Sequence, residues 1–419
     1  MHQADHPGGP LMLNLEEAVE RILRIVPSSS SEWIDLTLAH GRFLAEQILA
    51  PIELPPFDNS AMDGYAVRAA DVTSAAPDKP VRLRCVGKVP AGQVFGREMI
   101  TGQCVRLFTG SPLPNGADAV FMQEDTRVDS NDPSTVLFLD GAKPWENVRF
   151  RGEDAKRGTV LGEPGQKLTA THLTLLAAVG IAQVPVGRQP SVALLATGSE
   201  LKQPGEPLAP GQIYESNRIG LAALVARAGG ISRIFPLVPD ALEATQAALE
   251  KAFETCDLVV SSGGVSVGEM DFVKKALEQV GGDLDFWKVA IRPGRPFVLG
   301  QRPEPTRNGK QKVFFGLPGN PVSAFVTFLL LVRPAILKWQ GATELSLPTS
   351  PGTLAEPLNN DGERRHFIRV KVDGAGNVRS AGTQASHMLQ SLAAANGLVD
   401  LPPRTMLAQG DVVQVIRWD

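Results

Sequence analysis

A glycine-rich loop behind a short apolar run is the segment of this chain best suited to bind a ligand. It reads DLVVSSGGVSVGEMD from Asp257 to Asp271. The apolar run predicts a buried parallel strand, and glycines, which have no Cβ, let backbone N–H groups approach a ligand closely. The helix expected after the loop adds unpaired N–H donors and a positive dipole end, which favour a phosphate or another oxyanion. The loop residues expected to form this cradle are Ser262, Gly263, Gly264 and Ser266.

Acidic side chains follow several of the expected strands and turns. Glu200 lies in the TGSEL turn, Glu269 and Asp271 close the glycine loop, and the PPFDNSAMDGYAV loop carries Asp58 and Asp63. Taken singly, an aspartate in such a loop is usually a turn former, and a carboxylate in the first turn of a helix is a modest partner of its dipole. Taken together at neighbouring strand ends, carboxylates suit Mg²⁺, which prefers oxygen ligands and phosphate.

Three cations lie on a rigid, proline-rich turn. Lys288, Arg292 and Arg295 belong to KVAIRPGRP, which precedes the turn-rich FGLPGNPVSA. Such residues commonly form a solvated basic face. Beside glycine loops, however, arginines on rigid turns suit bidentate binding of tetrahedral oxyanions. The residue types together favour a site for Mg²⁺ and a phosphoanhydride.

Competing motifs are absent or poorly matched. The sequence contains no GxxxxGK[ST], no GxGxxG and no HExxH, which excludes the usual nucleotide, dinucleotide and zinc-protease signatures. The stretch from Gly264 to Gly268 does match GxSxG, and with Asp271 and His366 or His387 it could form a hydrolase triad. Two glycines separate the strand end from Ser266, which is looser than a nucleophile elbow requires, so a hydrolase is the less favoured alternative.

Composition limits the class of protein. A chain of 419 residues is expected to form about two to four domains. Its 41 basic and 45 acidic side chains give no global attraction to nucleic acid or to an anionic membrane. The three cysteines form no CxxC, which fits a reducing cytoplasm better than a disulfide framework. The apolar run 324–332 is far shorter than the roughly 20 residues that span a bilayer, so it predicts a buried helix.

Hydrophobic periodicity divides the chain into regions. Asn14 and Glu17 resemble a capping box before a helix, and a second helical stretch is expected over 36–49. Period-two runs then predict a small β domain, and alternating strands and helices after residue 191 predict a doubly wound sheet. The fold class is therefore multidomain α/β, with a central αβα domain and a C-terminal β barrel or sandwich. The expected domains are a discontinuous helical linker over 12–52 and 152–186, a β domain over 53–151, an αβα domain over 187–341 and a β domain over 342–419.

Eight motifs spread in order along the chain carry a resemblance to a known family. They are PPFDNSAMDGYAVR, TGSPLPNGADAVFMQED, NVRFRGED, ATGSEL, GQIYESNR, SSGGVSVGEMDF, FWKVAIRPGRP and FGLPGNPVSA. Together they resemble the molybdopterin molybdenumtransferases, the family that includes bacterial MoeA and the C-terminal domain of gephyrin. The resemblance implies an elongated homodimer with a lobed β domain and a C-terminal β barrel, in which the lobed domain of one chain lies against the αβα domain of its partner.

The resemblance also implies an activity and its participants. The activity is insertion of molybdate into adenylylated molybdopterin, with Mg²⁺-dependent release of AMP. By similarity the carboxylates that bind Mg²⁺ or orient the attacking group are Glu200, Asp240 and Asp271. The residues that help to hold molybdate or the phosphates are Lys288, Arg292, Arg295 and Ser386. The family implies transient contacts with a molybdopterin adenylyltransferase and with proteins that receive the cofactor. The other matched site positions are Asp63, Thr109, Arg149, Asp154, Pro318, Pro321 and Arg369.

Two departures from the family pattern affect the cations. Arg292 and Arg295 stand where many relatives have lysines, and Phe150 stands where a third arginine can occur. Charge is retained at the first two positions, but the geometry of the donors is not.

Two other functions share parts of this pattern. One is a molybdopterin adenylyltransferase, which shares the TGSE and GGVSVG loops, and the other is a non-catalytic scaffold of the same fold.

Overall fold

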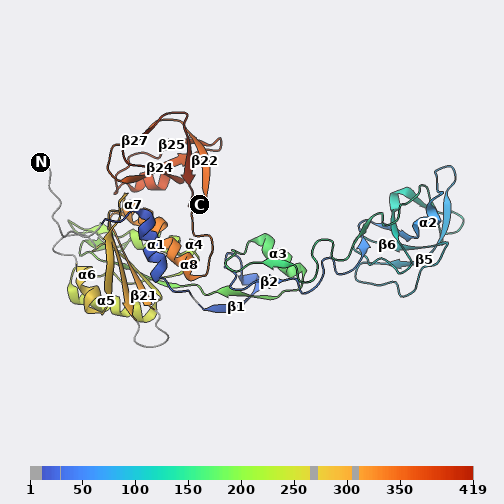
Figure 1. Cartoon of the computed structure of the whole chain (residues 1–419), viewed down its shortest axis with the longest axis horizontal. Helices are drawn as coiled ribbons and strands as arrows, with labels where there is room; N and C mark the ends of the chain where they lie inside the picture. The colour runs from blue at the N-terminus through green and yellow to red at the C-terminus, as the bar shows by residue number, and fades with distance from the viewer. Residues whose placement is uncertain (1–11, 29, 265–271, 304–310, 419) are drawn as a thin grey trace.

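The protein is elongated, with its domains arranged along one axis (Figure 1). The computed structural model describes residues 12–28, 30–264, 272–303 and 311–418. The αβα domain and the C-terminal barrel lie together at one end, a narrow linker forms the middle, and the lobed β domain lies at the other end (Figure 1). Within one chain, the lobed domain is therefore remote from the glycine loop.

The αβα domain is built on a six-stranded mixed sheet. The strand order is β16 (Ile231–Ile234), β13 (Ser191–Ala196), β17 (Leu258–Ser262), β21 (Gln311–Leu317), β20 (Pro296–Pro303) and β18 (Asp283–Lys288). The first four strands run parallel, as the alternating pattern predicts, but β20 and β18 are antiparallel. Antiparallel neighbours need no crossover helix, so helix–strand alternation did not reveal this edge of the sheet.

Helices cover both faces of this sheet, which confirms the expected three layers. One face carries α4 (Asn217–Arg227), α7 (Pro321–Thr327), α8 (Arg333–Trp339) and α1 (Leu15–Ile25). The other carries α5 (Leu242–Thr255) and α6 (Phe272–Gln279). The expected capping box at α1 is present, because Asn14 Oδ1 accepts from Glu17 N at 2.8 Å. Ile22 of α1 is fully buried in the αβα core, so α1 packs there and not in the linker.

The apolar segment expected as a buried helix is confirmed. It lies in a continuous helical stretch, Pro321–Trp339, in which a π-helical turn (Phe328–Val332) joins α7 to α8. Among the described residues, this stretch is long and apolar enough to span a membrane by length and composition alone, and 78% of its apolar window is buried inside the protein. It is part of the helical layer that packs on one face of the αβα sheet.

The linker is largely made of strands, which corrects the helix expected over 36–49. That stretch contains only a 3₁₀ turn (Leu36–Leu38) and β2 (Ile48–Leu49). β2 pairs with β11 (Val160–Gly162), and β1 (Ser31–Asp35) pairs with β12 (Gln183–Gly187). The chain leaves and returns through this region, so strands distant in sequence can pair, and those long-range pairs override local helix propensity. The helix expected later is present as α3 (Ala170–Ala178).

The lobed domain is a β domain, as the period-two runs predict. Its sheet contains β7 (Ala119–Met122), β4 (Gly64–Val67), β6 (Gln103–Leu107), β5 (Val81–Val89), β9 (Thr135–Phe138) and β8 (Thr126–Val128), in that order. A short helix, α2 (Ala69–Val72), follows β4. The ribbon of β3 (Asn59–Ser60) and β10 (Val148–Arg149) joins this domain to the linker.

The C-terminal domain is a closed five-stranded barrel. Its strands are β24 (Arg365–Val372), β25 (Asn377–Ser380), β22 (Thr349–Leu354), β28 (Val412–Ile416) and β26 (Gly397–Leu401). The pairing of β26 with β24 closes the ring. A hairpin of β23 (Leu358–Asn360) and β27 (Thr405–Leu407) and the helix α9 (Leu389–Ala394) complete it. Outside the ring, β19 (Ile291–Arg292) of the αβα domain pairs with β24 and fixes the two domains to each other.

Candidate functional site

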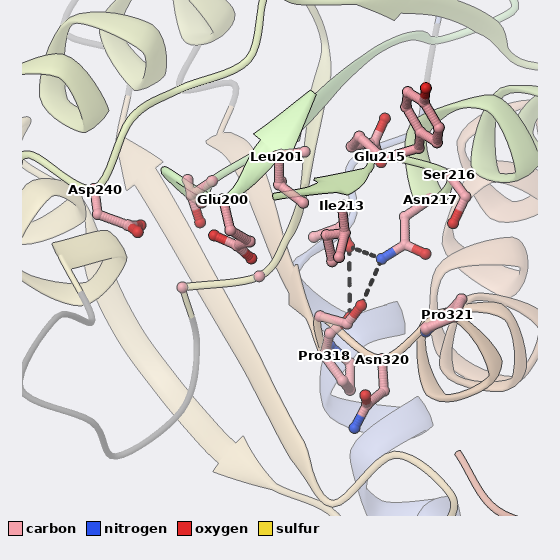
Figure 2. Close-up of a pocket in the computed structure, with 18 of the residues that line it drawn as sticks. Glu200, Leu201, Ile213, Glu215, Ser216, Asn217, Asp240, Pro318, Asn320 and Pro321 are labelled. Atoms are coloured by element: carbon pink, nitrogen blue, oxygen red, sulfur yellow. Dashed lines mark hydrogen bonds between the residues drawn. The ribbon is translucent and has the colours of Figure 1, made fainter. Parts of the chain in front are cut away.

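A cavity of about 650 Å³ opens at the carboxyl ends of β13, β17 and β21. This is where ligands bind to open α/β sheets. Polar and glycine-rich loops surround it (Figure 2), and Leu389 of the barrel domain also lines it. The cavity brings together seven of the residues singled out from the sequence, namely Glu200, Asp240, Ser262, Gly263, Gly264, Pro318 and Pro321.

The glycine loop requires glycine at its second position. Gly264 has a φ of +67°, and a Cβ there would lie 2.5 Å from Val273 Cγ2 and 2.6 Å from Thr197 Oγ1. The Thr197 hydroxyl is buried and has no hydrogen-bond partner among the described residues, and Thr197 lines the cavity. The start of the loop, at Gly263 and Gly264, is therefore packed closely against Thr197, which follows β13, and the Thr197 hydroxyl is left available there. Ser266 and Asp271 lie outside the described residues.

Asn217 joins three of the loops that line the cavity, and the sequence analysis assigned it no role. Its Nδ2 donates to Ser262 Oγ at 2.6 Å and to the carbonyl of Gly319 at 2.8 Å (Figure 2). Asn217 begins α4, Ser262 ends β17, and Gly319 follows β21. The quoted motif GQIYESNR contains Asn217, but only the tertiary structure brings it to these partners.

Two carboxylates lie on the same side of the cavity. Glu200 and Asp240 come from different loops, and Figure 2 shows both within the site. Asp240 is held by a reciprocal pair of bonds: its carboxylate accepts from Ser199 N at 2.9 Å, and its own N–H donates to Ser199 Oγ at 3.0 Å. Glu215 also lines the cavity, but it is buried and bound to Arg218 at 2.9 Å, so it is part of the framework.

These oxygens fit a Mg²⁺ ion that also binds phosphate. Mg²⁺ is commonly held by one or two carboxylates and completed by water and substrate phosphates. Glu200 and Asp240 supply two carboxylates, and the third predicted ligand, Asp271, lies outside the described residues. Among the described residues, no group of three or more His, Cys, Asp or Glu side chains is placed to hold a metal ion.

The cations of KVAIRPGRP lie at the seam between the αβα domain and the barrel. Arg292 on β19 pairs with His366 on β24 in the parallel register of these strands, and Arg364 Nη1 donates to the carbonyl of Ile291 at 2.9 Å. Lys288 ends β18. In the described part of the chain, no hydrogen bond or ion pair holds the side chains of Lys288, Arg292 or Arg295. They border the cavity through Pro296, which lines it, and do not line it themselves.

The two barrel residues matched from the sequence differ in their surroundings. The backbone of Ser386 lies at the edge of the cavity, because its carbonyl accepts from Val322 N at 3.2 Å, next to the lining residue Pro321. Arg369 is completely buried and donates to the carbonyls of Thr383 at 2.7 Å and Ala385 at 3.2 Å. These bonds fix the segment that leads to Ser386, and the remaining terminal nitrogen, Nη1, is buried without a hydrogen-bond partner among the described residues.

Four predicted site residues lie in the lobed domain or beside it. Asp63 accepts from both the backbone N–H and the hydroxyl of Thr109 at 2.8 Å, and these bonds hold the pKa of its carboxyl below the ordinary value. Arg149 lies on β10, and the Asp154 N–H donates to the carbonyl of Leu54 at 3.0 Å. The lobed domain and the αβα domain lie at opposite ends of the chain, with the linker between them (Figure 1), and none of these four residues lines the cavity of its own chain.

Comparison with known proteins identifies the family. Residues 13–180 match the MoeA N-terminal region (domain I and II), and residues 351–418 match the MoeA C-terminal region (domain IV). The molybdopterin molybdenumtransferase of Haemophilus influenzae is 40% identical over 415 residues, which are 96% of this chain and 98% of that protein. The chain belongs to the MoeA family. Molybdopterin molybdenumtransferase 2 of Mycobacterium tuberculosis is also similar, at 41% identity over 92% of this chain and 94% of that protein.

A solved structure supports the MoeA fold. The crystal structure of the molybdopterin biosynthesis MoeA protein from Pyrococcus horikosii superimposes with a TM-score of 0.81 at 34% identity, and the match covers 98% of this chain and 100% of that one. Residues 193–338 match a probable molybdopterin binding domain. That range contains all the residues lining the cavity except Leu389, so the cavity lies in the molybdopterin-binding part of this MoeA protein.

Proposed function

We propose that this protein inserts molybdate into adenylylated molybdopterin and releases AMP in a Mg²⁺-dependent step. The observation that carries this proposal is the cavity at the strand ends, which is lined by Glu200, Asp240, Gly263 and Gly264. The cations of KVAIRPGRP, which have no partner among the described residues, border it through Pro296. A site for a phosphoanhydride needs both oxygen ligands for Mg²⁺ and donors for phosphate oxygens. Membership of the MoeA family supports molybdopterin as the organic part of the substrate.

The protein's own residues bind and orient the reactants. The Gly263 N–H donates to the carbonyl of Leu317 at 3.2 Å and holds the start of the loop beside β21, whereas the N–H of Gly264 would donate to a phosphate. Asn217 keeps this part of the loop in register with the loop after β21. Lys288 and Arg292 provide positive charge for molybdate or for the leaving AMP. Mg²⁺, when bound by Glu200, Asp240 and Asp271, would neutralise charge on the phosphates.

The lobed-domain residues contribute to the site of a second copy. Asp63 and Thr109 are bonded to each other in the lobed domain, which lies at the opposite end of the chain from the αβα domain that carries Glu200 (Figure 1). A twofold dimer in which each lobed domain meets the partner's αβα domain would bring them to the cavity. The active form is therefore proposed to be a homodimer with two shared sites.

The test of the activity is AMP release from adenylylated molybdopterin by the purified protein, with and without molybdate and Mg²⁺. The proposed transferase releases AMP only when both are present. A molybdopterin adenylyltransferase would instead form the adenylylated compound from molybdopterin and ATP, and a scaffold would do neither. Asp271→Ala and Lys288→Ala are expected to abolish AMP release and leave the fold intact. Normal turnover by both variants would refute the assignment of these residues.

The test of the shared site is complementation. Asp63→Ala and Glu200→Ala proteins are each expected to be inactive when assayed alone. If each site uses one residue from each chain, mixed dimers contain one intact site, and random exchange of subunits restores about a quarter of the activity. A mixture that remains inactive although the subunits have exchanged would exclude a shared site.

A further inference from the structure

Two of the three cysteines lie side by side in the sheet of the lobed domain. Cys85 on β5 and Cys104 on β6 are partners in the parallel register of these strands. Both side chains project to the same face of the sheet, because both belong to the apolar cluster that contains Tyr65 and Phe138. Neighbouring strands are about 4.8 Å apart, which is within the range of Cα separations that a disulfide spans. The two sulfurs are therefore placed where a covalent bond between them needs no rearrangement of the sheet.

The two thiols differ in accessibility and in acidity. Cys104 is completely buried, whereas Cys85 is partly exposed. The Cys104 thiol donates a hydrogen bond to the sulfur of Cys85, and this bond lowers the pKa of Cys85 to about 6 although burial acts in the opposite direction. The same bond and burial raise the pKa of Cys104. At pH 7 Cys85 is therefore mainly a thiolate, and Cys104 remains a thiol.

The groups around Cys85 favour its ionised form. The register of β5 and β6 shifts between Cys85 and Lys88, and residues at such an irregularity leave the regular ladder of hydrogen bonds. Hydrogen bonds from the backbone of Gly87 and Arg106, and the positive charge of Arg106, add to the lowering of the Cys85 pKa. When protonated, Cys85 donates to the Gly87 carbonyl at 3.4 Å, which is a weak bond for a thiol.

The guanidinium of Arg106 is held in place by its neighbours. It lies over the Tyr65 ring, 5.0 Å from the ring centroid, and over Phe108 at 5.4 Å. Arg106 also follows Cys104 by two residues on β6, so both side chains lie on the same face of that strand. A partly exposed sulfur beside a fixed cation and backbone donors is the environment of a reactive cysteine. A buried thiol in contact with it is the arrangement of a resolving cysteine.

We propose that Cys85 and Cys104 form a redox site that reacts with hydroperoxides, with Cys85 as the attacking residue and Cys104 as the resolving one. The Cys85 thiolate attacks one peroxide oxygen, forms an S–O bond and breaks the O–O bond, and the other oxygen leaves as hydroxide or alkoxide. The Cys104 sulfur then attacks Cys85, which forms the S–S bond and releases water. Two thiols are oxidised, and one hydroperoxide is reduced to water and an alcohol, or to water alone if it is hydrogen peroxide.

Peptide mapping of the whole reduced protein after treatment with hydrogen peroxide tests the proposal. Trypsin cleaves after Arg84, Lys88, Arg97 and Arg106, so the two cysteines fall in separate peptides, 85–88 and 98–106. We expect these peptides to be joined, at a mass two hydrogens below their sum, and to separate again after addition of dithiothreitol. The map needs no substrate, so its result is independent of AMP release.

Cys256 is the internal control for this reaction. It is buried in the αβα domain, and burial raises the pKa of its thiol, so we expect it to stay reduced while Cys85 reacts. Oxidation of Cys256 as fast as that of Cys85 would overturn the proposal. Oxidation of Cys85 without a bond to Cys104, or no oxidation of Cys85, would also overturn it.

Variants separate the roles of the two cysteines and of Arg106. In Cys104→Ser, or in the more apolar Cys104→Ala, the sulfenic acid of Cys85 is expected to persist and to be trapped by dimedone. Cys85→Ser is expected to leave Cys104 reduced, and Cys256→Ser is expected to form the disulfide as the wild-type protein does. At pH 6, Arg106→Gln is expected to slow the reaction of Cys85 about two- to fivefold, and Arg106→Lys is expected to recover part of the loss.

Two results with these variants would contradict the proposed roles. One is the absence of a dimedone adduct on Cys85 in a folded Cys104 variant, and the other is a wild-type rate in Arg106→Gln. If neither Cys104 variant folds, the peptide map of the wild-type protein still decides whether the two cysteines react as a pair.

Discussion

The hydrogen bonds of Asn217 offer a direct test of how the cavity is held open. Asn217→Ala removes two bonds, to Ser262 Oγ at 2.6 Å and to the Gly319 carbonyl at 2.8 Å. A typical hydrogen bond contributes about 1 kcal/mol to stability. Asn217 is half-buried, so water replaces part of the loss, and we expect a destabilisation of about 1–2 kcal/mol. For a domain of this size that lowers the melting temperature by roughly 2–8 °C.

The same substitution is expected to slow the reaction, because the loops after β17 and β21 would no longer be held in register. If the whole 1–2 kcal/mol is lost from the transition state, AMP release slows by about five- to thirtyfold. Asn217→Asp is the matched control, since it keeps the size of the side chain but removes the donor that faces the Gly319 carbonyl. We expect it to be at least as slow as Asn217→Ala.

Calorimetric melting and AMP release, measured on the same preparations, distinguish the outcomes. Wild-type melting and wild-type AMP release in Asn217→Ala would refute the reasoning that this side chain joins the loops. A lower melting temperature with full activity would restrict Asn217 to a stabilising role.

Three further predictions concern other parts of the molecule. Gly264→Ala should lose about 1–2 kcal/mol of stability in urea denaturation, because the left-handed backbone and the contact with Val273 both disfavour a Cβ; an unchanged midpoint would contradict this. Arg369→Met should lower the free energy of unfolding in urea by about 2–3 kcal/mol, since buried carbonyls lose their donor. Slower AMP release with an unchanged free energy of unfolding would show instead that Arg369 contacts substrate. A hydrogen bond from Cys104 lowers the pKa of the Cys85 thiol to about 6, although burial acts in the opposite direction. The rate at which iodoacetamide alkylates Cys85, followed by mass spectrometry, should therefore be half-maximal near pH 6. The thiolate therefore increases as the pH rises through 6, and buried Cys104 should stay unmodified; half-maximal reaction above pH 8 would refute the assignment.

Local sequence features predicted the αβα domain well. Parallel strands buried on both faces are continuous apolar runs, so β13 and β17 were recognisable from VALLAT and DLVVSS. The antiparallel strands β18 and β20 were missed because their pairing depends on contacts across the sheet and leaves no crossover in the chain. The helix expected over 36–49 was wrong for a related reason: β2 forms only when residues 160–162 return beside it.

The candidate site was predictable in composition but not in arrangement. Glu200, Gly263, Gly264 and Pro318 follow strands that could be recognised, and these residues do meet at one cavity. Arg369 was matched by its motif, yet its guanidinium is bound inside the barrel. No sequence pattern distinguishes a buried structural arginine from one that faces a ligand, because that difference depends on which segments pack around it.

The sequence by itself determined the chemical character of this protein: glycines that admit a close ligand, carboxylates that suit Mg²⁺, and cations that suit an oxyanion. Those properties belong to single residues and short turns, so they can be inferred from the sequence before the three-dimensional structure is known. The tertiary structure decided which of them meet. It set Asn217 between three loops, buried the guanidinium of Arg369 in the barrel, and placed the lobed domain that carries Asp63 at the opposite end of the chain from the αβα domain that carries Glu200. These relations arise from long-range packing, which joins residues that the sequence keeps far apart.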